Sequence, residues 1–414
     1  MRFKGGGASV REIGTQLRVS HVVEGSVRRQ GNQVRISATL IDAADETQVW
    51  TNSFNGTLDD IFGLQTSVAN QIADALAIAL LPGSTAGSRE YVPDPRAYEE
   101  YLSGRFWEHK ETEEGWKVAI VHYERAVEID PRYALAYASL SQTCSTLSSW
   151  TTVAPEGPLR KAKAAMERAF ELDPNLPEAH AARAYYRLLG EWKWDEVDES
   201  FRSALAMNPI NSGMAYHWWG HYLTFAGRDQ EAIDAFKAAL RLDPLSALHR
   251  ACLGGAHVAA GDLDLADRSL EWALELNPQL PVAYNWLGRL REHQGRLDDA
   301  VGAWEEGARL AGGSALLSGT LGYGYGRIGE ADKAREVLEG LKSGLGSSEG
   351  YVAELNLARV YAGLGEADRA FEQLEIAYSK REPWILALKV GPGFDTIRDD
   401  PRFAELLRRI GVEP

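Results

Sequence analysis

The apolar positions of residues 178 to 312 recur at helical spacing in pairs of short segments, typically with a glycine turn between the two segments and a proline after the second. The copy at 213 to 244 has small or aromatic residues at fixed places: Trp219, Gly220, Gly227, Ala232, Phe236, Ala239 and Pro244. The stops are 35, 35 and 34 residues apart, at Pro174, Pro209, Pro244 and Pro278. This period predicts stacked helical hairpins, in which each pair buries its apolar face against the next.

A glycine stands in the middle of each first helix, although glycine costs about 1 kcal/mol of helix propensity against alanine. We expect it to let the second helix cross closely, with a bulky residue of that helix filling the space beside it. The glycines are Gly220, Gly254 and Gly288, and the bulky residues are Phe236, Leu270 and Trp304. A later glycine ends each first helix, because glycine adopts the left-handed conformation without strain. These glycines are Gly227, Gly261 and Gly295.

The pattern extends on both sides and predicts eight hairpins over residues 96–382. The third hairpin departs from it, because Trp192 and Trp194 stand where the turn residues are expected. Residues 383–414 are predicted to form a closing segment that caps the last apolar face. Its apolar side chains are Phe394, Ile397, Phe403, Leu406 and Leu407.

Residues 1–82 differ in kind and predict a small α+β domain, followed by a linker at 83–95. A short helix is expected at Val10 to Leu17. Alternating apolar positions then predict three antiparallel strands, at His21 to Arg28, Val34 to Ile41 and Gln48 to Phe54. In the second of these strands one face carries Val34, Ile36, Ala38 and Leu40. Helical spacing over Leu58 to Leu81 predicts a long amphipathic helix.

Composition narrows the classes of partner and compartment. The net charge of −15 argues against a nucleic-acid partner, which needs a basic surface, and favours neutral or basic protein partners. The two cysteines, Cys144 and Cys252, are too few for a disulfide framework. No run of residues reaches the 18 apolar residues or so of a membrane span, and no signal peptide is evident. A cytoplasmic location is therefore the default expectation.

Few residues suggest catalytic chemistry. His217 and His221 have the i, i+4 spacing of metal ligands, but no acid lies between them and no third ligand is evident. We therefore predict no metal site and interpret the pair as peptide-contacting or packed. Gly324 to Gly329 matches G-x-G-x-x-G without the preceding strand that a nucleotide site requires. The sequence predicts no cofactor and no enzyme.

The repeat signature and its period resemble the tetratricopeptide repeat. The resemblance implies a mainly α fold, a right-handed superhelix whose first helices line a concave groove. Family positions that face such a groove carry aromatic and apolar residues in the middle of the array and arginines toward its end. The candidate peptide-binding residues are Tyr186, Leu189, Met214, His217, His221, Thr224, Phe225, Asn285, Arg289, Glu292, His293, Tyr323, Arg327 and Arg359. The alternative is that some of them pack against the neighbouring helix.

The N-terminal part resembles the second half of the TolB-like domain, through Glu24 to Arg29 and Leu40 to Ala43. The match spans nearly all of residues 3 to 80. That domain precedes tetratricopeptide arrays in bacterial adenylate cyclases, winged-helix regulators and kinases. It normally begins with another strand and helix, so the domain is expected here in truncated form.

These resemblances imply two functions. The leading hypothesis is a non-catalytic scaffold that binds a peptide or protein segment in the groove. The alternative is a sensory or regulatory module derived from a larger bacterial signalling protein, which would place the chain on the periplasmic side if its parent is membrane-anchored. An enzyme, the third possibility, would require a metal or cofactor in the purified protein.

A sheet that lacks a strand exposes an unpaired edge, so the N-terminal region is expected to be the least stable part of the chain. We predict that amides of residues 20 to 80 exchange faster than those of the repeats in hydrogen-exchange mass spectrometry. Uniform protection across 20 to 80, matching the repeats, would contradict this expectation.

Overall fold

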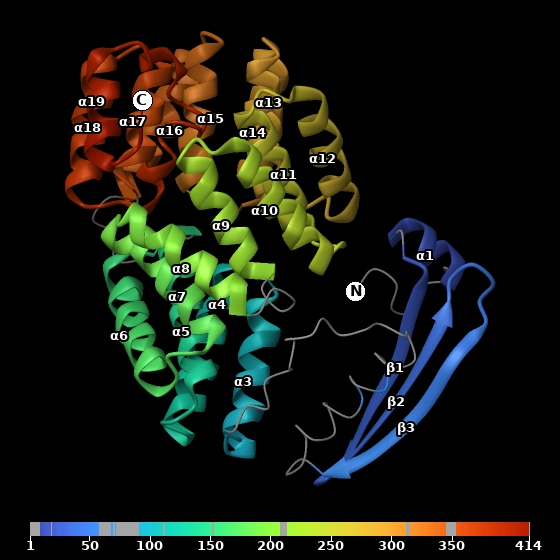
Figure 1. Ribbon diagram of the computed structural model, residues 1–414. Coiled ribbons are helices and arrows are strands. Elements are labelled where there is room, and N and C mark those ends of the chain that lie inside the picture. The colour runs from blue at the N-terminus through green and yellow to red at the C-terminus, as the bar shows by residue number, and fades with distance from the viewer. Residues whose placement is uncertain are drawn as a thin grey trace. The chain divides into compact units, whose positions relative to one another are not determined.

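The computed structural model (Figure 1) describes the chain in the ranges 9–17, 19–57, 91–110, 112–150, 153–207, 213–311, 315–344 and 353–413, together with residues 68 and 71. The chain divides into two compact units, Met1–Glu99 and Glu100–Pro414. No described helix combines the length and the hydropathy that a membrane-spanning segment needs.

The first unit contains a short helix followed by three antiparallel strands in the order β1-β2-β3, as predicted. The elements are α1 (Val10–Leu17), β1 (His21–Gln30), β2 (Gln33–Asp42) and β3 (Gln48–Thr57). Each strand is longer than the sequence suggested, because the pairing continues into the polar residues at its ends. The predicted helix at 58–81 lies outside the described residues except for 68 and 71. Of the predicted linker at 83–95, only 91–95 is described, and Pro95 already belongs to the next helix.

The two faces of this sheet differ, as the alternation in its middle strand predicted. Leu40 and Phe54 lie on one face and are buried. On the opposite face, hydroxyl groups pair across β2 and β3. Ser37 Oγ lies 3.0 Å from Ser53 Oγ, and Thr39 Oγ1 lies 2.9 Å from Thr51 Oγ1. Such cross-strand pairs fix the register of the two strands.

The second unit consists of eight consecutive helical pairs within the described residues, the number that the period predicted. The unit boundary falls inside the first helix. The pairs are α3 (Pro95–Glu108) with α4 (Glu113–Ile129), α5 (Ala134–Trp150) with α6 (Glu156–Leu172), α7 (Pro177–Tyr186) with α8 (Trp194–Met207), α9 (Gly213–Phe225) with α10 (Asp229–Leu242), α11 (Ala247–Ala259) with α12 (Leu263–Leu276), α13 (Pro281–His293) with α14 (Leu297–Leu310), α15 (Ala315–Arg327) with α16 (Ala331–Gly344), and α17 (Glu354–Gly363) with α18 (Ala367–Ser379).

Glycine ends the first helix of each of the last five pairs in the left-handed conformation, as predicted for three of them. In the fourth pair, Gly227 has φ of +71°, and the amide of Arg228 donates to the carbonyl of Leu223 at 2.9 Å. This bond satisfies one of the carbonyls that a helix end leaves without a partner. The equivalent glycines are Gly261, Gly295, Gly329 and Gly365.

The third pair differs from the others at its turn. A π-helix, η2 (Arg187–Glu191), follows α7, and Trp192 adopts φ of +56°, which is unfavourable for a bulky side chain. The Trp192 ring lies 5.6 Å from that of Tyr378 between centroids, and the indole nitrogen of Trp194 donates to the carbonyl of Ile410 at 2.8 Å. The two tryptophans stand in place of turn residues and contact Tyr378 and Ile410, which lie in the C-terminal part of the chain.

The C-terminal segment contains two 3-10 helices, η3 (Pro383–Ala387) and η4 (Asp395–Ile397), and the helix α19 (Pro401–Ile410). The side chain of Asp400 caps α19 by accepting from the amide of Arg402 at 2.9 Å, and Gly411 ends it with φ of +89°. All five predicted capping side chains are buried, at 1 to 3% exposure.

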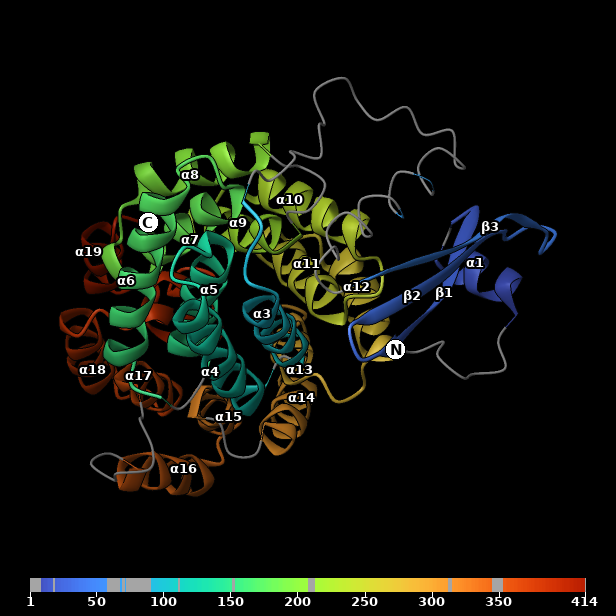
Figure 2. The ribbon, with the colours of Figure 1, turned by 90° about the horizontal axis from the view of Figure 1, so that it is seen from below.

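This segment joins the last helical pairs to the early ones. One apolar cluster contains residues of α7 to α11 together with residues of α14 to α19. The indole nitrogen of Trp384 donates to the carbonyl of Ser149 in α5. In both views α18 and α19 lie beside α6 and α8 (Figures 1 and 2), so the array returns to its third pair.

The close crossing of α9 and α10 gives a stability prediction. A Cβ atom built on Gly220 would lie 2.8 Å from the ring of Phe236, which is buried. We expect Gly220→Leu to lower the free energy of unfolding by roughly 1–3 kcal/mol through overpacking. Phe236→Ala leaves a cavity and should cost roughly 3–5 kcal/mol in urea denaturation.

Gly302 in α14 is the matched control, since a Cβ atom there meets nothing within 4 Å. Gly302→Ala should leave stability unchanged or raise it by up to about 1 kcal/mol, because alanine is the better helix former. Unfolding of Gly220→Leu at the wild-type urea midpoint would show that the predicted register is wrong.

Candidate functional site

The structure buries most of the residues predicted to line a groove. Met214 is 41% exposed and His293 is also exposed, while Asn285 and Arg327 are half-buried. The remaining ten are buried: Tyr186, Leu189, His217, His221, Thr224, Phe225, Arg289, Glu292, Tyr323 and Arg359. Their role in binding a partner stays a prediction, and the contacts that bury them define the candidate site.

Part of this burial comes from the C-terminal segment. The Trp384 ring lies 6.4 Å from His221 and 6.1 Å from Phe225 between centroids. Further along the segment, Asp395 bonds to Arg289, and Thr396 Oγ1 donates to the carbonyl of Ala362 at 2.8 Å. We call the surface that contacts residues 383–398 the inner face. It is formed by His221, Phe225, Arg289, Arg359 and Ala362.

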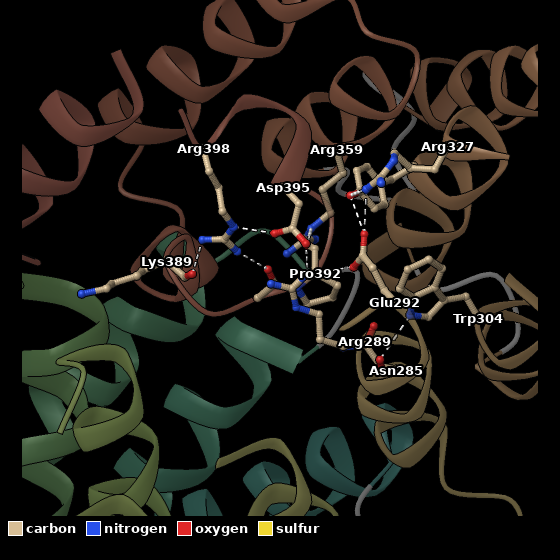
Figure 3. A network of polar contacts seen from close by, with 12 residues as sticks. Asn285, Arg289, Glu292, Trp304, Arg327, Arg359, Lys389, Pro392, Asp395 and Arg398 are labelled. Atoms are coloured by element: carbon tan, nitrogen blue, oxygen red, sulfur yellow. Dashed lines mark hydrogen bonds and ion pairs between the residues drawn. The ribbon is translucent and has the colours of Figure 1, made fainter. Parts of the chain in front are cut away.

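A buried polar network forms the centre of the inner face (Figure 3). Glu292 accepts hydrogen bonds from Arg289 at 2.8 Å, from the hydroxyl of Tyr323 at 2.6 Å and from Arg327 at 3.0 Å. Arg289 is 4% exposed and Glu292 8% exposed. Charges buried this deeply persist only when they are paired and hydrogen-bonded, so these residues hold one another in place.

The carboxylate of Asp395 extends this network to the C-terminal segment. It accepts from Arg289 of α13 and from Arg398, one turn later in its own segment. Burial raises the pKa of Asp395, but the hydrogen bond from Arg289 and the charges of both arginines outweigh burial and lower this pKa to about 2. Arg398 also donates to the carbonyls of Lys389 and Gly391, the latter at 3.2 Å. The loop 389–398 is therefore fastened internally and to α13.

Arg359 of α17 is the second anchor of this loop. Its Nε donates to the carbonyl of Pro392 at 3.3 Å, and another guanidinium nitrogen donates to Asn356 Oδ1 at 2.7 Å. The guanidinium lies 5.5 Å from the ring centroid of Phe394, which is 1% exposed. Burial lowers the pKa of Arg359 to about 10. A carbonyl, an amide and an aromatic ring thus surround the Arg359 cation.

Histidines form a second group, on α9 and α11. The rings of His217 and His221 lie 4.7 Å apart between centroids, and that of His249 lies 5.0 Å from His217. Burial, followed by the neighbouring histidines, holds the pKa of His217 well below its usual range. Burial and His249 also lower the pKa of His221 to about 3. Both rings are therefore neutral at physiological pH.

Gly324 to Gly329 has a structural role within the helical array. The stretch lies in α15 and its following turn, without the preceding strand that a nucleotide site requires. A Cβ atom on Gly326 would lie 2.4 Å from the backbone of Gly363 in α17. Close crossing of two helices accounts for this glycine.

Sequence reasoning did not find Asp395 and Trp384 as contacts of the inner face. It assigned the C-terminal segment to capping because only the apolar residues there were periodic. One signal was available: Arg289 and Arg359 stand at helix positions next to small and apolar residues, where a cation needs a partner from another element. The identity of that partner depends on how the chain returns, and no local pattern encodes this return.

Helical pairs with a glycine turn also occur in a known family of repeats. Residues 252–315 match the family model of the tetratricopeptide repeat. This span carries the tetratricopeptide repeat. The matched span covers α12, α13 and α14, which supply Arg289 and Glu292 of the inner face. The TolB-like resemblance of residues 3 to 80 stays a prediction.

Two curated relatives are similar to part of this chain. It is 32% identical over 182 residues to putative adenylate cyclase 3 of Rhizobium meliloti (strain 1021), which covers 43% of this chain and 31% of that protein. It is 24% identical over 222 residues to tetratricopeptide repeat protein 37 of Xenopus laevis, or 52% of this chain and 13% of that one. The chain thus spans under a third of either relative.

A solved structure supports the fold. The crystal structure of the APC/C hetero-tetramer Cut9-Hcn1 matches with a TM-score of 0.50 at 19% identity, over 76% of this chain and 55% of that chain. At this identity the likeness extends to the fold alone.

The Asp395 contacts give a prediction for the pH dependence of stability. The folded pKa of about 2 lies below the ordinary value of 3.8, so the carboxylate contributes stability above pH 3.8 that is lost as pH falls toward 2. We expect Asp395→Asn to unfold with about 1–2 kcal/mol less free energy than wild type at pH 6. In urea titrations this difference should shrink between pH 4 and pH 2.

Asp399 is exposed and provides the control in the same segment. Asp399→Asn should change the unfolding free energy by no more than about 0.5 kcal/mol at any pH. A deficit of Asp395→Asn that stays constant from pH 6 to pH 2 would be inconsistent with an ionic role.

Proposed function

We propose that this chain is a non-catalytic interaction scaffold whose tetratricopeptide array binds a segment of a partner protein on the inner face. The observation that supports this proposal is the way in which the array holds the loop 389–398 of its own chain. Arg289 of α13 and Arg359 of α17 bind groups that any polypeptide offers, a carboxylate and a main-chain carbonyl. A partner segment with the same groups at the same spacing fits the same donors.

The contacts of the loop specify what such a segment should contain. Arg359 recognises a carbonyl, at Pro392, which is independent of side chain. Phe394 fills a buried place beside the Arg359 guanidinium, and Asp395 bonds to Arg289. We therefore infer a preference for glycine, an aromatic residue and an acid, in that order, because Gly393 has φ of +102° and a Cβ atom on it would lie 2.8 Å from Arg359. The net charge of −15 favours a partner that is neutral or basic outside this motif.

The loop and a partner segment would compete for the same donors. A segment of the same chain acts at an effective concentration in the millimolar range or so, which a partner must overcome. Any change that loosens the loop should therefore increase the apparent affinity for a partner, since more of the protein is competent to bind.

A second function is favoured by one observation, the identity to putative adenylate cyclase 3 over 182 residues. We propose as the alternative that the chain is a regulatory module of a signalling protein. The helix and three strands of the first unit, with their TolB-like resemblance, also support it. In that case the array would transmit the state of a partner to an effector domain elsewhere.

A peptide screen tests the first proposal. The full-length protein is panned against a displayed library of random peptides, and the dissociation constants of the selected peptides are measured by fluorescence polarisation. We expect enrichment of the motif glycine, aromatic, acid. Asp395→Asn should lower the dissociation constant of a peptide about tenfold. This corresponds to a loss of about 1.4 kcal/mol in the free energy that holds the loop in place. In the Asp395→Asn background, where the loop competes less for this donor, adding Arg289→Ala should weaken binding, because the carboxylate of the peptide loses its partner.

Arg291→Ala is the matched control on the same helix, since Arg291 bonds to Asp267 of α12 at 2.9 Å and not to the loop. It should bind the peptides as wild type does. Selected peptides whose affinity ignores both Arg289→Ala and Asp395→Asn would refute the inner-face assignment. The regulatory alternative is decided by the genomic reading frame upstream of Met1: an effector domain running into this chain favours it.

A further inference from the structure

Three potential metal ligands converge between the fourth and fifth helical pairs. They are His217 and His221 on α9 and Cys252 on α11, and one donor atom from each lies within 4.8 Å of the other two. All three side chains are buried, at 1, 4 and 2% exposure. Within the part of the chain that the structure describes, no other group of three histidine, cysteine or acidic side chains meets this distance.

The repeat architecture produces this convergence. His217 and His221 lie one helical turn apart and so project from the same side of α9. The first helices of consecutive pairs are neighbours, so α11 brings Cys252 beside them although it lies 31 residues after His221. The sequence prediction of no metal site rested on the lack of a third ligand, and α11 supplies that ligand.

His217 is the residue that ordinary packing does not explain. Neither of its ring nitrogens has a hydrogen-bond partner among the described residues, although both are buried. A neutral imidazole carries one donor and one acceptor, and buried polar groups of native proteins are nearly always satisfied. A hydrogen bond between Cys252 and His221 accounts for that contact alone and leaves His217 unexplained.

The distances agree with those of a tetrahedral site. His221 Nε2 lies 3.5 Å from Cys252 Sγ. With zinc bonds of about 2.3 Å to sulfur and 2.0–2.1 Å to nitrogen, tetrahedral angles place these two atoms about 3.5 Å apart. The same geometry separates the centres of two bound imidazole rings by roughly 5 Å. The rings of His217 and His221 are 4.7 Å apart.

His249 lies beside this set but outside it, because its donor atoms are not within 4.8 Å of those of all three ligands. Its ring centroid lies 5.0 Å from that of His217, and its Nδ1 is buried without a hydrogen-bond partner among the described residues. Structural zinc sites take four protein ligands, and a mixture of imidazole and thiolate selects zinc over magnesium or calcium. Two histidines and one cysteine supply three of these ligands, and His249 is the neighbouring candidate for the fourth.

We propose that His217, His221 and Cys252 form a buried structural site for zinc, and that the His249 side chain turns to take the fourth position when the ion binds. The ion ties α9 to α11 and so fixes the fourth helical pair against the fifth. The ion lies between these helices and gives the His217 ring the partner that no hydrogen bond among the described residues supplies. The site goes beyond the scaffold function and does not depend on it.

Metal binding by the full-length reduced protein tests the proposal. After chelation and dialysis against zinc, mass spectrometry of the elements should find about one zinc per chain. Titration with Co²⁺ alone should produce a thiolate-to-cobalt charge-transfer band that zinc abolishes. Cys252→Ser should lose this band, and His221→Gln should weaken zinc binding at least about tenfold.

Two buried residues outside the cluster provide matched controls. Cys144→Ser removes the other cysteine, in α5, and His257→Gln removes a second buried histidine of α11. Both should keep the wild-type zinc content and cobalt band. Wild-type protein without stoichiometric zinc, or a band that survives Cys252→Ser, would overturn the site.

Folding of each variant is followed by far-UV circular dichroism. If the ligand variants fail to fold, X-ray absorption spectroscopy of the zinc-loaded wild type decides the question. A first shell of one sulfur with two or three imidazole nitrogens supports the proposal. A shell of nitrogen and oxygen without sulfur rejects it.

Discussion

The contact between the C-terminal end of the chain and the third helical pair is the constraint on which the array depends. The indole of Trp194 donates to the carbonyl of Ile410, and these residues are 216 positions apart. In a repeat array each unit usually contacts only its neighbours, and stability is roughly a sum over those contacts. Here the last units also contact early ones, so the apolar cluster of the third and fourth pairs continues into the seventh and eighth.

This return of the chain explains why charged residues lie buried on the inner face. Removing a guanidinium from water costs free energy. A buried arginine is therefore found only where carboxylates or carbonyls accept its hydrogen bonds and offset that cost. Glu292 and Asp395 do so for Arg289, and the carbonyl of Pro392 helps to do so for Arg359. Because these bonds are directional, they select one position of the loop 389–398. An apolar inner face would allow the same loop to bind in several positions, because apolar contacts are not directional.

Much of the fold could be predicted from residues that are close in the sequence. The features that were missed depend on contacts between residues that are far apart in the sequence. The period, the glycines at helix ends and the strand alternation each report on neighbours within about one repeat, and the structure confirms them. The burial of Arg289 depends on Asp395, which lies 106 residues later. Cys252 stands near His221 only because α9 and α11 are adjacent. Trp192 and Trp194 were noticed as departures from the repeat, and their reason lies in Tyr378 and Ile410.

The joined ends also have a mechanical consequence. In a helical solenoid with free ends, small rotations between neighbouring pairs add up, so the coil lengthens and shortens like a soft spring. Trp194 and Trp384 link the end of this coil to α8 and α5, and a rotation at one joint must then be compensated at others. The array between these links should therefore resist extension more strongly than an array with free ends. This resistance should be lost once the two indole contacts break.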